Sequence, residues 1–173
     1  MYPLGGGTVI ILGIDPGIAI VGYGIIDYSR GKFHVLDYGA ITTPAHTPPE
    51  DRLSTIYADM NTLIKTYHPE EMAIEELFFN SNQKTAIQVA EARGVILLAA
   101  RNNNVRINEY TPLQVKQSVV GYGRAEKQQV QTMVTTLLGL PKIPKPDDTA
   151  DALAIAVCNA HTGGSRLKDF YNL

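Results

Sequence analysis

The stretch TVIILGIDPG, residues 8–17, determines the fold that we expect for this chain. Residues 8–15 are mostly β-branched or apolar, which predicts a buried strand that ends at Asp15. Pro16 and Gly17 follow at once and predict a turn. The stretch therefore predicts both a central strand and a carboxylate placed where that strand leaves the sheet.

Outward from this strand, the chain changes from strand patterns to alternating helix and strand patterns. Apolar and β-branched residues predict two more strands at 19–28 and 32–43, joined by a turn short enough for a hairpin. The remaining patterns predict a helix at 50–68, a strand at 71–77, a helix at 82–102, a strand at 104–109, and helices at 111–119, 125–138 and from about 147 onward. This order predicts an α/β fold: a five-stranded mixed sheet, with three antiparallel strands and then two parallel crossovers, and helices on both faces.

The length of 173 residues suits one domain, which we expect at 8–162. Residues 1–7 are expected to be a flexible leader and 163–173 a tail without an assigned role. No apolar run approaches the roughly 20 residues of a membrane span, and the first residues lack the features of a secretory signal. The single cysteine, Cys158, fits a reducing compartment, so we expect a cytoplasmic protein with no membrane partner.

Four carboxylates occupy positions that suggest a site. Asp15 and Glu75 lie near the ends of predicted strands, while Asp148 and Asp151 are three residues apart on one helix face. If the strand at 71–77 lies beside the first strand, the four converge, and no run of Lys or Arg lies next to them in the sequence to neutralise them. Oxygen ligands of this kind suit Mg²⁺ or Mn²⁺, and a pair of such ions supports phosphodiester hydrolysis.

Each carboxylate also has an ordinary structural explanation when it is taken alone. Asp15 can begin a turn, and the two aspartates of the last helix can cap it. Glu75 can form a salt bridge at a sheet edge, and strand alternation puts only one of Glu75 and Glu76 on a given face. We assign the neighbouring Asp147 to helix capping or to no role. The set of four is more informative than any member.

The formal charge of −2, from 15 basic and 17 acidic residues, argues against a nucleic-acid partner unless the charges are unevenly placed. They are uneven between residues 93 and 145, where the only acidic residues are Glu109 and Glu126. The basic residues of this segment are Arg93, Arg101, Arg106, Lys116, Arg124, Lys127, Lys142 and Lys145. This segment predicts a basic face that binds phosphates, although a solvated surface is the alternative.

Two aromatic residues, Phe78 and Phe79, directly follow the predicted strand at 71–77. Alternation would bury one and expose the other, and an exposed aromatic beside a metal site can stack on an unpaired base. The alternative is that both belong to the core. A second open question concerns Ala86, Ala90 and Gly94, whose spacing of four suits close helix packing at a dimer seam or inside the fold.

Five blocks of sequence, in this order and spacing, resemble a known family. They are ILGIDPG (11–17), MAIEELFF (72–79), ARGV (92–95), LQVKQSVVGYGRAEKQQVQ (113–131) and DDTADALAIAV (147–157). Together they resemble the RuvC-type Holliday-junction endonucleases of the ribonuclease-H-like fold. The resemblance runs from about residue 9 to 161 and leaves out both ends of the chain.

This resemblance implies roles for particular residues and partners. The expected catalytic and metal-binding residues are Asp15, Glu75, Asp148 and Asp151, and the expected DNA-binding residues are Phe78, Lys116, Arg124 and Lys127. The expected cofactor is Mg²⁺, with Mn²⁺ as a substitute and two ions per active site. The family acts as a homodimer that makes two symmetric nicks in a four-way DNA junction, with a thymine-rich sequence preference. Its partners are a RuvA-type junction-binding tetramer and a RuvB-type branch-migration motor.

Two other hypotheses come from different classes of protein. The segment GIDPG (13–17) is compatible with the phosphate loop of an actin-like nucleotide-binding lobe. That fold needs a second lobe, for which 173 residues are too few. A scaffold that binds junctions without cutting them is also compatible with the fold, although the intact set of carboxylates favours an enzyme.

Overall fold

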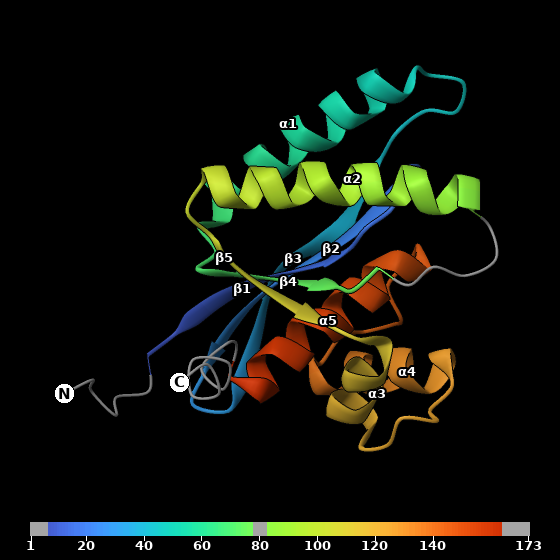
Figure 1. Ribbon diagram of the computed structural model, residues 1–173. Coiled ribbons are helices and arrows are strands. Elements are labelled where there is room, and N and C mark those ends of the chain that lie inside the picture. The colour runs from blue at the N-terminus through green and yellow to red at the C-terminus, as the bar shows by residue number, and fades with distance from the viewer. Residues whose placement is uncertain (1–6, 78–82, 164–173) are drawn as a thin grey trace, which may run out of the picture.

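The computed structural model describes residues 7–77 and 83–163, and its centre is one five-stranded sheet (Figure 1). The strands are β1 (Val9–Asp15), β2 (Ile20–Ser29), β3 (Lys32–Thr42), β4 (Glu71–Glu75) and β5 (Arg106–Tyr110), in the order β3-β2-β1-β4-β5. β2 pairs antiparallel with both β1 and β3, whereas β4 pairs parallel with both β1 and β5. The predicted mixed sheet is confirmed, with β1 at its centre.

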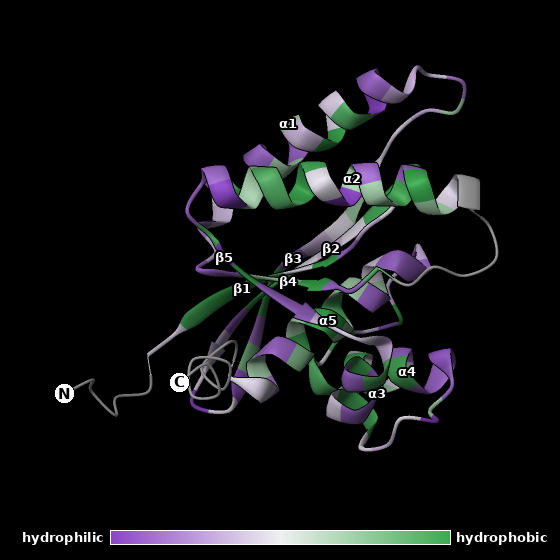
Figure 2. Ribbon diagram, in the orientation of Figure 1, coloured by the Kyte–Doolittle hydropathy of each residue, from purple (hydrophilic) through white to green (hydrophobic). Residues whose placement is uncertain are grey.

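Helices cover both faces of the sheet, as predicted. α1 (Pro49–Tyr67) and α2 (Gln83–Asn102) lie on one face, and α5 (Asp147–Thr162) lies on the other. α3 (Pro112–Val120) and α4 (Lys127–Leu137) pack against α5 on its far side. Figure 2 shows the apolar residues concentrated in the central strands and along α5. No helix in the described ranges is both long and apolar enough to span a membrane.

Two strand boundaries differ from the prediction by two residues, and the others differ by at most one. β4 ends at Glu75 rather than at 77, and β5 begins at Arg106 rather than at 104. Asn104 has a left-handed backbone with a φ of 59°, and the amide of Val105 donates to the carbonyl of Ala100. The chain therefore still belongs to the turn after α2 at these residues, and the strand begins only when the turn is complete.

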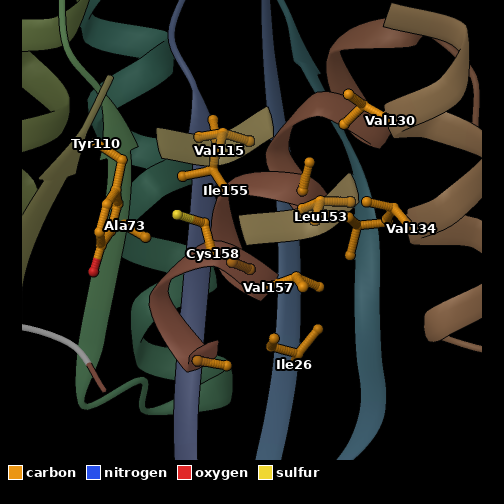
Figure 3. Packing of buried hydrophobic residues seen from close by; sticks show 14 of the residues in the cluster. Ile26, Ala73, Tyr110, Val115, Val130, Val134, Leu153, Ile155, Val157 and Cys158 are labelled. Atoms are coloured by element: carbon orange, nitrogen blue, oxygen red, sulfur yellow. The ribbon is translucent and has the colours of Figure 1, made fainter. Parts of the chain in front are cut away.

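Alternate residues of the central strands face two separate apolar cores. Leu12, Ile14, Met72 and Ile74 belong to the core shared with α1 and α2. The intervening Ile11 and Ala73 belong to the core shared with α5, part of which is shown in Figure 3. Burial on both faces explains the continuous apolar run of the first strand. The residues at the strand ends that continue the alternation of Ile11 and Ala73 also face α5.

α5 lies directly on the sheet because two strand positions carry no side chain. A Cβ atom on Gly13 would overlap with the carbonyl oxygen of Ala152 and would lie 2.8 Å from the Cβ of Ala156. A Cβ atom on Gly22 would overlap with the carbonyl oxygen of Asp148. Glycine inside a strand is typical of such close backbone approach. The first turn of α5 is therefore held against the ends of β1 and β2.

Candidate active site

The carboxylates of Asp15 and Glu75 lie side by side at the carboxyl ends of β1 and β4. Ile14 pairs with Ile74 in the parallel ladder, so the next residue of each strand occupies the same level. Both carboxylates lie on the same face of the sheet as Ile11 and Ala73, which is the face that α5 covers. Glu76 follows the end of β4, and its amide donates to the carbonyl of Tyr110. Alternation therefore places Glu75, and not Glu76, beside Asp15.

The first turn of α5 brings two further carboxylates over these strand ends. The residue that caps the helix is Pro146, and no side chain accepts a capping hydrogen bond there. The assignment of Asp147 to capping is therefore wrong: its carboxylate instead accepts a hydrogen bond from Lys145. The hydroxyl of Thr149 donates to the carbonyl of Gly39 at 2.9 Å and fixes the turn on the sheet. Asp148 and Asp151 are thus free of any capping role.

Burial and mutual repulsion perturb the strand carboxylates. Burial raises the pKa of Asp15 to about 8, and the negative charges of Asp151, Glu75 and Asp148 contribute to the rise. The pKa of Glu75 is also raised, first by burial and then by the charge of Asp151. The charges of all three other predicted carboxylates therefore act on the pKa of Asp15, and the four form one electrostatic cluster.

A lysine that is distant in sequence partly neutralises this cluster. Lys127 Nζ, at the start of α4, lies 2.8 Å from Oδ2 of Asp151, and the hydrogen bond between them raises the pKa of Lys127. Its charge also lowers the pKa of Asp15. The sequence shows no run of basic residues beside the four carboxylates, and the packing of α4 against α5 supplies a single cation from a distance. On the next turn of α4, the buried Gln131 amide donates to Oδ1 of Asp151 at 3.5 Å.

The cluster fits a divalent cation in its chemistry. Its four carboxylates supply hard oxygen donors, and the negative charges of the other three contribute to the raised pKa of Asp15 even though Lys127 lowers it. Within residues 7–77 and 83–163, no three side chains of His, Cys, Asp or Glu are grouped closely enough to hold one ion as they stand. A bound cation would have to draw the carboxylates inward and replace the ammonium of Lys127 at Asp151.

Two cavities adjoin the cluster and meet at Glu75. The smaller, of about 200 Å³, is lined by Asp15, Pro16, Glu75, Glu76, Leu77, Val89 and Pro112. The larger, of about 260 Å³, is lined by Glu75, Pro112, Val115, Lys116, Lys127, Val130, Asp151, Ala154 and Ile155. Glu75 and Pro112 line both cavities, so the strand carboxylates and the two lysines border two adjacent hollows.

The predicted DNA-binding residues divide into three groups. Lys116 and Lys127 lie at the larger cavity, where both lower the pKa of Glu75. Arg124 is exposed in the loop between α3 and α4, and no contact of the described residues joins it to the carboxylates. Phe78, like Phe79, lies outside the described residues.

One member of the predicted basic face is not a surface residue. The Arg93 side chain is only 15% exposed, and its Nη2 lies 3.0 Å from Oε2 of Glu109. Its Nε also donates to the backbone carbonyl of Glu75 at 3.4 Å. Arg93 therefore connects α2 with the ends of β4 and β5 beneath the carboxylates. Its place in the sequence, among the basic residues, gave no sign of this buried role.

The sheet order and the acidic residues at the ends of β1 and β4 and at the start of the last helix define a ribonuclease-H-like nuclease fold. The family model described as crossover junction endodeoxyribonuclease RuvC matches residues 11–159. The chain belongs to this family.

Known relatives align with this chain over most of their length. The crossover junction endodeoxyribonuclease RuvC of Alkaliphilus oremlandii is 64% identical over 155 residues, which cover 90% of this chain and 94% of that protein. The protein of the same name from Clostridioides difficile is 62% identical and covers 89% and 91%. Among solved structures, T. thermophilus RuvC in complex with Holliday junction substrate superimposes with a TM-score of 0.85 at 36% identity, covering 90% and 94%.

Proposed function

We propose that this protein is a metal-dependent endonuclease that cuts four-way DNA junctions. The observation that carries the proposal is the cluster of four carboxylates at the ends of β1 and β4 and at the start of α5. The solved T. thermophilus relative, described with a Holliday junction substrate, supports junction DNA as the substrate. Strand breaks made symmetrically in two opposing strands would resolve such a junction during recombination and repair.

In this proposal Asp15, Glu75, Asp148 and Asp151 are the metal ligands, and the cofactor is Mg²⁺, with Mn²⁺ as a substitute and two ions per site. Divalent cations bound at such a cluster supply an activated water and stabilise the leaving oxygen of the phosphodiester. Partial burial lowers the effective dielectric around Asp15 and strengthens its interaction with a cation. Gln131 holds Oδ1 of Asp151 and limits the directions in which that carboxylate turns.

The lysines at the larger cavity have a separate role in this proposal. Once a cation takes the place of its ammonium at Asp151, Lys127 is free to contact a phosphate of the DNA, together with Lys116. Arg124 extends the same basic edge along the exposed loop after α3. Phe78 is proposed to meet the junction beside the cut, as the family resemblance implies.

The second nick is proposed to come from a second copy of the chain. α2 leaves Ile87 58% exposed and Leu98 52% exposed. Gly94 lies between them, and a Cβ atom there would meet nothing within 4 Å. No neighbour in the described part of the chain therefore requires a glycine at position 94, and this favours the alternative that the small residues of α2 form a dimer seam. RuvA-type and RuvB-type partners and a cytoplasmic location are likewise proposed, with residues 8–162 as the single nuclease domain.

Cleavage of a synthetic four-way junction by wild type and by Asp15→Asn, in Mg²⁺ and in chelator, tests the proposal. We expect wild type to make paired nicks only with the metal, and the variant to bind the junction without cutting it. Asp59→Asn is the matched control, because Asp59 is exposed on α1, away from the cluster. Metal-dependent cleavage by Asp15→Asn at the wild-type rate would contradict the proposed role of the carboxylates as metal ligands.

A further inference from the structure

The larger cavity beside the carboxylates has an apolar floor that cation binding does not use. Its floor is formed by Val115 of α3, Val130 of α4, and Ala154 and Ile155 of α5, and its volume is about 260 Å³. Figure 3 shows Val115, Val130 and Ile155 in the apolar cluster among these three helices. Oxygen-ligated cations and phosphates gain nothing from aliphatic walls, so the floor points to a ligand with an apolar part.

The rim of the same cavity is charged and carries both signs. Glu75 and Asp151 belong to the proposed metal cluster, while Lys116 and Lys127 present ammonium groups. A ligand that fits both parts has an anionic group at the rim and a compact apolar ring over the floor. A nucleotide has this composition, with its phosphate next to its sugar and base.

The size of the cavity limits the ligand to one nucleotide base. Pockets for drug-sized ligands have roughly 300–1,000 Å³, so a volume of about 260 Å³ is too small for a base pair. Enzymes that accept a single base take it out of its stack and hold it between apolar or aromatic side chains. The residues of the floor are aliphatic, so the base would be stabilised by burial rather than by stacking.

We propose that this cavity receives the base of one unpaired nucleotide directly beside the cleaved phosphodiester. The proposal rests on the proposed junction endonuclease function and adds to it a requirement on the substrate. A base leaves its stack most easily where pairing is already interrupted, as at the centre of a branched junction. The cavity therefore favours cleavage at a branch point over cleavage within a continuous duplex.

The test combines a change in the protein with a change in the DNA. Val130→Phe places a larger side chain in the cavity, while Met133→Phe makes a similar change on the exposed part of α4. Each protein is assayed in single-turnover cleavage on junctions that are intact or that carry an abasic nucleotide at one of the two positions flanking the cut. At one position we expect the abasic change to slow wild type at least about tenfold. Val130→Phe should slow the intact junction to a similar extent and be insensitive to the abasic change.

The two changes should not multiply, because both remove the same contact between base and cavity. If Val130→Phe cuts the intact junction as fast as wild type, or if the two losses multiply, the base does not occupy this cavity. Val115→Phe fills the cavity from α3 and replaces Val130→Phe if that variant does not fold.

A second measurement does not depend on cleavage. A fluorescent base analogue, 2-aminopurine, is placed at the sensitive position, and the junction is mixed with protein in chelator. We expect wild type and Met133→Phe to increase the fluorescence as the base leaves its stack, and Val130→Phe to give no increase. An equal increase with all three proteins overturns the cavity proposal. Absence of cleavage by wild type in Mg²⁺ would instead overturn the proposed function, while the fluorescence result would still decide on the cavity.

Discussion

Gly22 of β2 lies so close to Asp148 that a Cβ atom at position 22 would overlap with the carbonyl oxygen of that aspartate. Gly22 is also the residue that pairs with Asp15 in the antiparallel ladder. One glycine therefore sets the distance between the aspartate of β1 and the first turn of α5. The arrangement of the carboxylate cluster depends on the absence of a side chain at this position.

We expect Gly22→Ala to lower both the free energy of unfolding and the rate of junction cleavage. The added methyl group meets backbone, which cannot turn aside, so α5 must shift at a cost of about 1–3 kcal/mol. Urea denaturation and single-turnover cleavage measure the two effects. Gly123→Ala is the matched control, because its Cβ would overlap only with the end of the Leu113 side chain, which is 54% exposed and can rotate, and would lie at an ordinary contact distance of 3.7 Å from Gln117 Cγ. Equal losses for the two variants would contradict the close-packing argument.

The raised pKa of Asp15 predicts how the stability of the metal-free protein changes with pH. Its ordinary value is 3.8 and its value in the folded protein is about 8, so between these pH values the folded state holds a proton that the unfolded state has lost. The free energy of unfolding therefore falls as the pH rises through this window. In Asp15→Asn this contribution is absent. We expect the variant to gain on the order of 2 kcal/mol relative to wild type between pH 5.5 and 8.5.

Urea unfolding in chelator at the two pH values measures this gain, and Asp59→Asn should show no such trend. Addition of Mg²⁺ at pH 8.5 should then stabilise wild type and leave Asp15→Asn largely unchanged, because a ligand stabilises the state that binds it. A variant that is no more stable than wild type at pH 8.5 in chelator would show that neither burial nor the neighbouring carboxylates raise the pKa of Asp15.

A buried polar network fixes the other end of α5. Asn159 Nδ2 donates to Oε2 of Glu71 at 2.6 Å, and its Oδ1 accepts from Asn108 Nδ2 and from the hydroxyl of Tyr110, each at 2.8 Å. Asn159→Leu would remove three hydrogen bonds, while Asn108 keeps its bond to Glu71 and Tyr110 keeps its contact with Thr162. We expect a loss of about 3 kcal/mol in the free energy of unfolding, because each lost hydrogen bond costs about 0.5–1.5 kcal/mol.

Urea denaturation of Asn159→Leu and of Asn102→Leu compares this network with a surface position. Asn102 is exposed, and its amide donates only to the hydroxyl of Tyr57, at 3.1 Å. We expect the control to lose less than about 1 kcal/mol. A small loss for Asn159→Leu as well would mean that water enters the network and replaces the missing partner.

Much of the fold was predictable because its signals are local. The strand at 9–15 is buried on both faces, so its apolar run is continuous and ends visibly at Asp15. Asp148 and Asp151 were predictable as a pair from helix geometry. Their position over β1 and β4 depends on the parallel pairing of two strands that are separated along the chain by β2, β3 and α1, which the order of elements suggested.

The contacts that the sequence did not predict all join elements that are distant along the chain. Lys127 reaches Asp151 only because α4 packs against α5. Arg93, which counted as part of a basic surface, is largely buried beneath β5. Charge runs in a sequence do not distinguish a solvated face from an internal ion pair, because both place the same residue types at the same spacing.

Arg93 leads to the last prediction, since its guanidinium contacts Glu109 and the backbone carbonyl of Glu75 at once. Lysine keeps the positive charge but lacks the planar fork that makes both contacts. We expect Arg93→Lys to slow junction cleavage about tenfold or more, because the end of β4 that carries Glu75 is less firmly held. The Mg²⁺ concentration for half-maximal cleavage should rise as well, which a loss of overall stability alone would not produce. Arg101→Lys, at an exposed position of the same helix, is the control. In a double-mutant cycle, Arg93→Lys and Glu109→Gln should couple by about 0.5–3 kcal/mol, and strictly additive effects would show that the ion pair does not position Glu75.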